Sequence, residues 1–547
     1  MPKAIFAGCA RSCAPFLDGV LANVEALGST YDAFELVIVE NDSADDTRNR
    51  IEEFARSRPN VSLIDADGLD EKHPIRGDRL AVARNIYMDA VRDDKYSDCD
   101  DLVVLDFDDV NCQPIDVEAF RAARRWLWDE PHRRGVFANS AYFYYDIWPL
   151  RHPTWCPDDC WRRVRQTQRT LGFDEAVRRH VARLQIPIPP ATAPIVVDSA
   201  FGGLGIYRRE ATLQAAYAGL FPEGDEVCDH VAFNRTVKGS DGVLAIYPPL
   251  QNQAPLEHVI ASLRGTKKMI VEYGGSRCAL IGPPRNQLQG LLETNPLYKR
   301  RLPALARMVF DDTPEETFID AGANIGDTIA LARLAGARMP VIASEASLRD
   351  CKFLWANIKR LPRLFGDARL VWGRVGAIAG SGEKALEADS SQPAGARLAT
   401  VSGSAPVVRL AGLANDRPVA LLKANAEGFG PDGIASELEF LRAKQPILWL
   451  EDHTASQTGA AKWRDLIGSM AGQWNHAILF DNFGFAIADG ETGRMADQMM
   501  DLMTYARRQR ERPGYKPALH HIDVALFPTR FGHIFHEFRQ VIPELIS

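Results

Sequence analysis

The sequence predicts an α/β protein of two domains, each built on a mostly parallel sheet. Apolar runs of strand length alternate with amphipathic helical segments, which is the pattern of β-α-β units. The chain has 547 residues, which is too many for a single hydrophobic core. The character changes near residue 264, so we expect one domain over residues 1–264 and another over 265–547, with a helical lead-in at about 285–311.

The first domain should open with four strands in chain order. Each is a mainly apolar run: Ala4–Cys9, Phe34–Glu40, Val61–Ile64 and Leu102–Leu105. Amphipathic or Arg-rich helices are expected between them, from about Cys13 to Leu27, from near Arg48 and from Leu80 to Ala90. Residues that follow such strands lie beyond the carboxyl end of the sheet, where α/β folds bind ligands.

The fourth strand runs directly into Asp106-Phe107-Asp108-Asp109. An Asp-x-Asp pair at a strand end suits a hard divalent cation, Mn²⁺ or Mg²⁺, which prefers oxygen ligands and can neutralise a diphosphate. The alternative is a helix N-terminus or a solvated strand end rich in acidic residues.

Two earlier segments carry polar residues that suit a nucleotide. Glu40 ends the second strand and Asp45 lies in the polar loop that caps the next helix, while Arg84 and Asn85 lie on the Arg-rich helix. A carboxylate can accept hydrogen bonds from base N–H groups, and arginine pairs with phosphate. Taken singly, these residues fit a helix cap or a solvated helix face; their order together with the Asp-x-Asp favours a nucleotide site.

This order of motifs resembles GT-A glycosyltransferases, which use nucleotide-sugar donors. The resemblance implies a role for each residue: Glu40 holds the base, Asp45 belongs to the same loop, Arg84 and Asn85 lie beside the ribose and diphosphate, Asp106 meets ribose and metal, and Asp108 meets the metal. The aromatic segment Asn139–Arg151 is more loosely similar to fungal capsule-associated mannosyltransferases.

Three further features extend this resemblance towards the acceptor. The segment Ser199–Arg209 is similar to the Gly-Gly-x-Gly-x-Tyr loop that borders the acceptor. Asp229 matches the carboxylate that deprotonates the acceptor hydroxyl in inverting enzymes. In a retaining enzyme Asp229 would orient the substrate instead, and a plain helix-start carboxylate is the further alternative. His258 is a candidate additional metal ligand.

The second domain contains a glycine turn of the nucleotide type. A strand ends in Asp320-Ala321-Gly322-Ala323-Asn324-Ile325-Gly326 and feeds a helix from Thr328. The next strand ends in Glu345, about 25 residues later, where a ribose-binding carboxylate belongs in such folds. A Rossmann-like core with a tight turn and no cofactor is the alternative.

This combination resembles class I S-adenosylmethionine methyltransferases, specifically the FkbM family, and implies a Rossmann-like fold. In that resemblance Asp320, Gly322, Asn324 and Gly326 shape the cofactor pocket, Glu345 grips the ribose hydroxyls, and Lys423 and Glu427 remain from the family's catalytic segment. Asn425 replaces the acid of that segment and cannot accept a proton, so methyl transfer would depend on positioning.

The composition excludes several other classes of protein. Hydrophobic residues make up 46% and charged residues 25% of the chain, as in ordinary soluble proteins. The formal net charge of −8 argues against a general nucleic-acid binder. No apolar run has membrane-spanning length and no signal-peptide pattern is present, so we expect a cytoplasmic protein. Peripheral membrane association and the oligomeric state stay open.

The nine cysteines are expected to be free, reduced thiols in that compartment. A zinc site at the spaced pairs Cys9/Cys13 or Cys156/Cys160 is the less favoured interpretation.

The sequence as a whole predicts a bifunctional enzyme of surface polysaccharide synthesis. It would transfer a sugar from a nucleotide-sugar donor to a glycan or glycolipid acceptor, with a divalent metal, and methylate a sugar with S-adenosylmethionine. Two rivals remain: a single-activity glycosyltransferase whose second domain is a scaffold or presents the glycan, and a non-catalytic glycan-binding protein.

Overall fold

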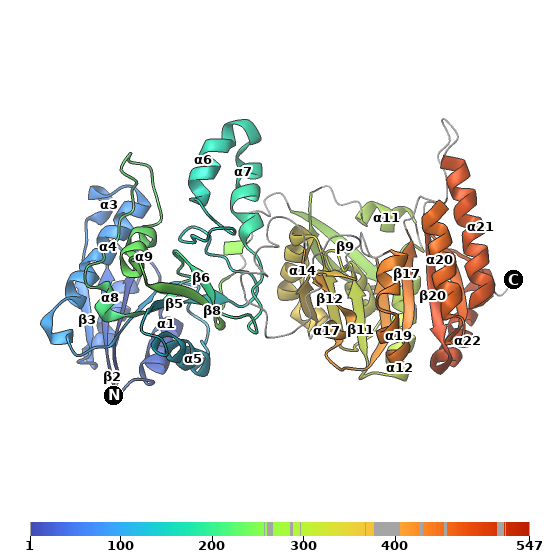
Figure 1. Cartoon of the computed structure of the whole chain (residues 1–547), viewed down its shortest axis with the longest axis horizontal. Helices are drawn as coiled ribbons and strands as arrows, with labels where there is room; N and C mark the ends of the chain where they lie inside the picture. The colour runs from blue at the N-terminus through green and yellow to red at the C-terminus, as the bar shows by residue number, and fades with distance from the viewer. Residues whose placement is uncertain are drawn as a thin grey trace. The chain divides into compact units, whose positions relative to one another are not determined.

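The computed structural model describes residues 2–545 except 256–257, 260–265, 285–287, 296, 367, 377–404, 426–429, 453–456, 511–518 and 520. These residues form two compact units, which divide between residues 264 and 265 (Figure 1). Each unit contains one sheet of eight strands. The prediction of an α/β protein is therefore confirmed.

The first unit is built on a mixed sheet in the order β3-β2-β1-β4-β7-β5-β8-β6. Its strands are β1 (Lys3–Ala10), β2 (Ala33–Glu40), β3 (Val61–Asp65), β4 (Asp101–Leu105), β5 (Arg133–Ser140), β6 (Ile195–Val197), β7 (Leu204–Arg208) and β8 (Val243–Asn252). The first four run parallel, whereas β7 is antiparallel to both β4 and β5. The start of β7 therefore lies at the same edge as the carboxyl end of β4.

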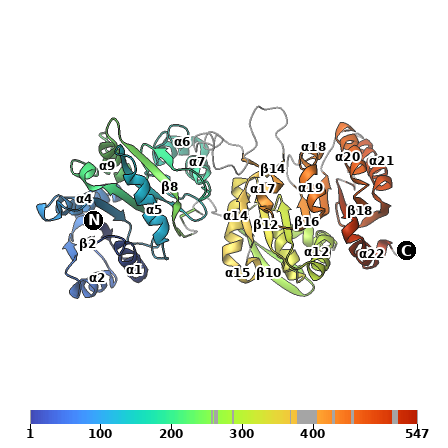
Figure 2. The same ribbon diagram turned by 60° about the horizontal axis from the view of Figure 1, so that its bottom comes forward.

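Helices cover both faces of this sheet. They are α1 (Leu17–Gly28), α2 (Thr47–Arg56), α3 (Leu69–Lys72), α4 (Arg76–Val91), α5 (Val117–Trp128), α6 (Cys160–Leu171), α7 (Phe173–His180), α8 (Arg209–Thr212) and α9 (Asp229–Lys238). Alternate strand residues such as Phe6 and Val103 pack with α1 and α5 in one core cluster. Helices α4 and α9 lie side by side (Figure 2). Helix α4 also contacts β1 and β2. Burial on both faces explains why β4 is entirely apolar after Asp101.

The second unit has a sheet in the order β13-β12-β11-β16-β17-β20-β18-β19. Its strands are β11 (Thr317–Ala321), β12 (Val341–Glu345), β13 (Arg369–Trp372), β16 (Val419–Ala424), β17 (Ile447–Asp452), β18 (Trp474–Asp481), β19 (Ala486–Glu491) and β20 (Ile522–Pro528). The first five strands of this order are parallel, and β20 is inserted antiparallel between β17 and β18. In chain order the parallel strands read 3-2-1-4-5, the arrangement of doubly wound nucleotide-binding sheets.

The remaining elements of this unit surround the sheet. The helices are α11 (Leu288–Thr294), α12 (Arg301–Asp312), α13 (Asp327–Leu334), α14 (Leu348–Arg360), α15 (Pro362–Phe365), α17 (Leu410–Ala414), α18 (Pro431–Ala435), α19 (Leu438–Lys444), α20 (Gln457–Met470), α21 (Thr492–Arg510) and α22 (Gly532–Gln540), and the short strands are β9 (Lys267–Tyr273), β10 (Ser276–Gly282), β14 (Arg374–Val375) and β15 (Val407–Val408). The β9–β10 hairpin packs on α13 and α14. Asn357 ties it to the glycine turn, because its amide donates to Ile281 O and Ile325 O, both at 2.9 Å.

Two expectations about composition can be compared with the structure. All nine cysteines are free thiols in the structure. Across the part of the chain that the structure describes, no helix combines the length and apolar character that a membrane span requires.

Candidate active site

The polar residues predicted in the first unit meet at one edge of its sheet. The strand order reverses between β1 and β4, and a ligand crevice forms outside the carboxyl ends of the strands at such a switch point. The loop after β4 begins here, and the Asp106 amide donates to Gly203 O at 2.9 Å. This bond joins the acidic loop to the glycine loop that precedes β7.

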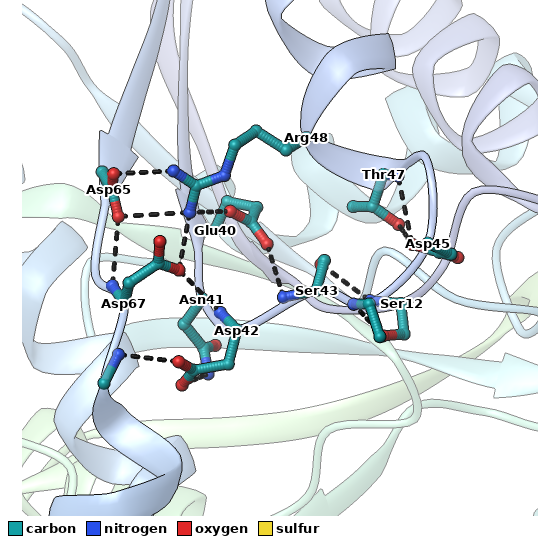
Figure 3. Close-up of polar contacts among 12 residues, drawn as sticks. Ser12, Glu40, Asn41, Asp42, Ser43, Asp45, Thr47, Arg48, Asp65 and Asp67 are labelled. Carbon is teal, nitrogen blue, oxygen red and sulfur yellow. Dashed lines mark hydrogen bonds and ion pairs between the residues drawn. The ribbon is translucent and has the colours of Figure 1, made fainter.

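Glu40, the last residue of β2, is fully shielded from solvent. Figure 3 shows its contacts with Ser43 and Arg48. Its Oε1 accepts a hydrogen bond from the Ser43 amide at 3.2 Å, and its Oε2 forms an ion pair with Arg48. Arg48 also pairs with Asp65 at 2.7 Å and Asp67 at 2.6 Å. Glu40 is thus already bound within the protein, and Arg48 joins the ends of β2 and β3. The sequence pattern marked Arg48 only as the start of a helix and gave no sign of this role.

Asp45 has a similar role in ordering the loops. Its carboxylate accepts from the Ala14 amide and the Thr47 amide, both at 3.1 Å, and Thr47 Oγ1 in turn accepts from the Cys13 amide at 2.7 Å. The Thr47 hydroxyl, which donates to this carboxylate, is the main reason that the pKa of Asp45 is lowered. The bonds to Ala14 and Cys13 fasten the loop after β1 to the start of α2. Figure 3 shows the contact between Asp45 and Thr47.

Arg84 joins two carboxylates that are far apart in the sequence. Its Nη2 donates to Asp106 Oδ1 at 2.9 Å, and its Nε lies 2.8 Å from Asp229 Oδ2. The guanidinium also lies over the rings of Phe201 and Tyr217, at 5.3 and 5.7 Å from their centroids. Burial raises the pKa of Asp229, and the Arg84 charge opposes that rise. Because Arg84 and Asp229 are both buried, each charge is compensated by the other, and loss of either would leave an unpaired buried charge.

Asn85, the neighbour of Arg84, does not share this arrangement. Its amide group donates to Tyr217 O at 3.0 Å and accepts from the Tyr217 amide at 2.9 Å. These two bonds fasten α4 to the segment before α9. Both polar groups of the Asn85 side chain are therefore engaged in hydrogen bonds within the protein.

Asp108 and His258 lie in and beside the acidic loop. Asp108 Oδ1 accepts from the Val110 amide at 3.0 Å. Burial, followed by repulsion from Asp106, raises the pKa of Asp108 to about 7. His258 Nε2 lies 2.9 Å from Asp109 Oδ1, so the predicted extra metal ligand is placed against the third acid of the loop.

Asp146 is a carboxylate of this region that sequence analysis did not single out. Its Oδ2 accepts from the Gly202 amide at 2.8 Å, which attaches it to the glycine loop. Partial burial raises the pKa of Asp146 to about 7. The signal for it in the sequence was the loose family resemblance of the aromatic segment Asn139–Arg151, which contains it.

The donor set fits a divalent cation of the magnesium type. Within the described residues, no three His, Cys, Asp or Glu side chains are grouped so as to hold a metal by themselves. Asp106 and Asp108 supply carboxylates at one point, and their mutual repulsion disfavours two uncompensated charges. Mg²⁺ is commonly held by one or two carboxylates, with water and substrate phosphates completing its shell.

In the second unit, the glycine turn lies at the switch point between β11 and β16. Asp320 is fully buried and pairs with Lys423 Nζ at 3.0 Å, and the same Nζ donates to Gly322 O at 2.8 Å. Burial raises the pKa of Asp320, and Lys423 opposes that rise. Lys423 therefore holds the turn against β16. Gly326, at φ +88°, has no room for a side chain, because a Cβ would lie 2.6 Å from Leu354 Cδ1.

Glu345 also lies against this turn. Its two oxygens accept from the amides of Asn324 and Ser347, both at 2.7 Å. An ionised carboxylate has about four acceptor positions, so two ribose hydroxyls can still bind. The Glu345 carboxylate is therefore chemically compatible with a nucleoside ligand.

The predicted catalytic segment after β16 is described only in part. Glu427 lies outside the described residues. The Asn425 amide donates to Glu451, which lies one residue before the end of the neighbouring strand β17. Glu451 and Asp523 line a cavity of about 90 Å³ with Asn425. No motif in the sequence pointed to either of these acids.

Comparisons with known proteins give no close relative. No family model matches the chain, and no curated protein sequence matches it. A search of solved structures finds the mannosyltransferase PcManGT from Pyrobaculum calidifontis in complex with GDP-Man and Mn²⁺, at 15% identity and a TM-score of 0.27, over 47% of this chain and 57% of that one.

Two other solved structures match a similar share of the chain. S. aureus TarS 1-349 matches at 14% identity and a TM-score of 0.26, over 48% of this chain and 64% of that one. Glucosyl-3-phosphoglycerate synthase from Mycobacterium tuberculosis in complex with Mn²⁺, UDP and glucosyl-3-phosphoglycerate matches at 13% identity and a TM-score of 0.25, over 52% and 90%. The chain thus spans less than two thirds of the first two structures. At these scores the residues of the chain itself must carry the functional assignment.

Proposed function

We propose that the first unit transfers a glycosyl group from a nucleotide-diphosphate-sugar donor to a hydroxyl of a glycan or glycolipid. The observation that carries this proposal is the placement of Asp106 and Asp108 at the switch point, with Arg84 on the first of them. That site offers oxygen ligands for a cation, beside a loop region suited to a nucleotide. Synthesis of a surface polysaccharide is the setting that we propose for this activity.

The residues of the site have separate tasks in this reaction. Asp108, with Asp106, holds the divalent cation, which when bound neutralises charge on the departing diphosphate. Arg84 holds the Asp106 carboxylate in place through their hydrogen bond, so that the carboxylate is already oriented for the ribose and cation when the donor binds. Glu40 and Arg48 keep the base-binding loop folded before the donor arrives. Preorganisation of this kind lowers the entropy lost on binding.

The direct test is a panel of nucleotide sugars incubated with the protein, with Mn²⁺ or Mg²⁺ or with EDTA. We expect release of nucleoside diphosphate from one donor with metal and at least about a 100-fold slower release with EDTA, because the charge on the leaving group would go unneutralised. Undiminished turnover in EDTA would contradict the assignment. Mass analysis of added oligosaccharides identifies the product.

A second function is favoured by the glycine turn and Glu345 of the second unit. We propose that this unit binds S-adenosylmethionine and methylates a sugar hydroxyl. Glu345 would accept from the ribose hydroxyls, while Lys423 would hold the turn in place. The cofactor supplies a methyl group on a positively charged sulfur, which is a strong donor. Asn425 can only position the acceptor, so catalysis would rest on alignment.

Replacement of Glu345 tests the cofactor site apart from catalysis. We expect Glu345→Ala to weaken binding of S-adenosylmethionine about 10- to 100-fold, since hydrogen bonds to a charged group contribute about 1.5–3 kcal/mol. Isothermal titration calorimetry measures the change. Glu345→Gln keeps acceptor oxygen and shape and should lose less, which separates recognition from damage to the turn. Binding that is absent in the wild type, or equal in all three proteins, would leave this unit as a scaffold or glycan-presenting module.

A further inference from the structure

Asp229 is poorly placed to touch an acceptor sugar. Its side chain is 3% exposed, and its Oδ2 lies 2.8 Å from Arg84 Nε. The guanidinium that covers it is held at its other end by Asp106 and lies over Phe201 and Tyr217. The other oxygen of Asp229, Oδ1, lies 3.7 Å from Cys228 Sγ, so an acceptor hydroxyl would have to displace buried neighbours to reach Asp229. Displacement of Arg84 would leave the buried Asp229 carboxylate without its charge partner.

Asp146 differs from Asp229 in its exposure to solvent and in its charged neighbours. The residue is partly exposed, and no arginine or lysine in the described chain forms an ion pair with it. Its Oδ2 accepts from the Gly202 amide at 2.8 Å. Its Oδ1 receives no hydrogen bond from any described residue, so this oxygen has its full accepting capacity available.

The position of Asp146 is fixed relative to the acidic loop. Gly203, the residue after its hydrogen-bond partner, accepts from the Asp106 amide at 2.9 Å and from Asn111 Nδ2 at 2.7 Å. Gly202 itself has φ +67°, and a Cβ on it would lie 2.3 Å from Ala138 O. The glycine loop therefore has little freedom, and it holds the Asp146 carboxylate beside the loop that carries Asp106 and Asp108.

The residue before Asp146, Tyr145, connects this segment to His258 and Gln185. The Tyr145 ring lies 5.2 Å from the His258 ring, and His258 contacts Asp109. The Gln185 amide donates to Tyr145 O at 3.1 Å and to His258 O at 2.8 Å, which fastens the segment to the one before β6. Asp146 is thus an anchored carboxylate with one open oxygen at the rim of the site.

We propose that Asp146, and not Asp229, takes the proton from the acceptor hydroxyl. This inference rests on the proposed glycosyl transfer. In the step, the acceptor oxygen forms a bond to the anomeric carbon. The bond from that carbon to the diphosphate oxygen breaks, and its electron pair leaves with the nucleoside diphosphate. The acceptor proton moves to Asp146 Oδ1. A base that acts opposite the leaving group gives inversion at the anomeric carbon.

The comparison of Asp146→Asn with Asp229→Asn tests this assignment. Asparagine keeps the hydrogen bond from Gly202 through its carbonyl oxygen but cannot accept the proton. We expect Asp146→Asn to lower kcat about 100- to 10,000-fold, the usual contribution of a general base. The affinity for UDP or GDP with Mn²⁺, measured by calorimetry, should stay within about 3-fold, since Asp146 does not hold the donor. Asp198→Asn, at an exposed acid before the same loop, is the control and should keep wild-type kcat.

Two further readouts distinguish a base from a structural residue. The acid limb of the kcat/KM pH profile should disappear in Asp146→Asn, and Asp146→Glu should recover part of kcat. The product of the wild type should have the inverted anomeric configuration by NMR. A kcat for Asp146→Asn within about 3-fold of wild type, or a retained product, would overturn the inference while leaving glycosyl transfer intact. A wild type that neither binds a nucleoside diphosphate nor releases one would overturn the proposed function and this inference together.

Discussion

Asp108→Ala should abolish metal-dependent turnover, with kcat/KM at least about 1,000-fold below wild type. Asp108 is the acid of the loop whose pKa rises to about 7 through burial and the neighbouring Asp106, so a bound cation relieves its repulsion most directly. Without it, one carboxylate remains to hold the cation against water, and the negative charge on the diphosphate is left unneutralised. Initial rates with saturating Mn²⁺ measure the loss.

The stability of this variant should be unaffected or slightly increased. Removal of one of two repelling acids relieves like-charge repulsion in the free protein. Asp89→Ala is a suitable control, because Asp89 lies on α4 with its side chain 78% exposed and forms an i,i+3 ion pair with Arg92. Asp108→Ala turnover within 10-fold of wild type would show that the acidic loop does not hold the cation. Parallel thermal melts exclude misfolding as the cause of lost turnover.

Arg84→Met should lower the free energy of unfolding of the first unit by about 3–5 kcal/mol, the usual effect of breaking a buried ion pair. Methionine fills similar space but leaves Asp229 without its charge partner and Asp106 without its hydrogen bond. Arg84→Lys should recover only part, since an ammonium cannot contact both acids in a planar fork. Hydrogen exchange followed by mass spectrometry reports the two units separately.

A double variant and the pH dependence make this test specific. Adding Asp229→Asn to Arg84→Met should cost less than the sum of the two single changes, because the orphaned charge is removed. The pKa of Asp229 is already raised by burial and should rise further without Arg84. The folded variant then binds more protons than the unfolded chain, so its stability deficit should shrink as the pH falls from 8 towards 5. Arg121→Met, at an exposed pair with Glu118, should cost less than about 1 kcal/mol. A deficit independent of pH would contradict the role of Asp229.

The strands and strand-end motifs could be predicted because their signals are local. A fully buried strand such as β4 requires consecutive apolar residues, and the polar residue that ends it marks the edge of the sheet. The same reasoning located the glycine turn after β11 and the acid at the end of β12. The helical pair α6 and α7 was not predicted, since these helices are strongly charged and only their sparse apolar positions are buried.

The pairings within the site could not be predicted, because they join residues distant in the chain. Arg84 lies on a helix whose sequence suggests a solvated surface, and its pairing with Asp229 depends on the position of α9. Asp146 is one more acid in the sequence until the antiparallel strand β7 places Gly202 beside it. Glu451 likewise reaches Asn425 only through the pairing of β16 with β17. Tertiary contacts, and not residue type, therefore decide which of these acids is paired with a cation and which is not.

The direction of β7 also has a consequence for synthesis of the chain. Asp101 at the start of β4 pairs with Arg208 at the end of β7, about a hundred residues later. As the ribosome releases the chain, β1 to β4 can pair while one edge of β4 stays uncovered, open to mispairing with other strands. The part of the unit that carries Glu40, Arg84 and Asp106 therefore emerges first, and the glycine loop that anchors Asp146 arrives with the strand that closes this edge.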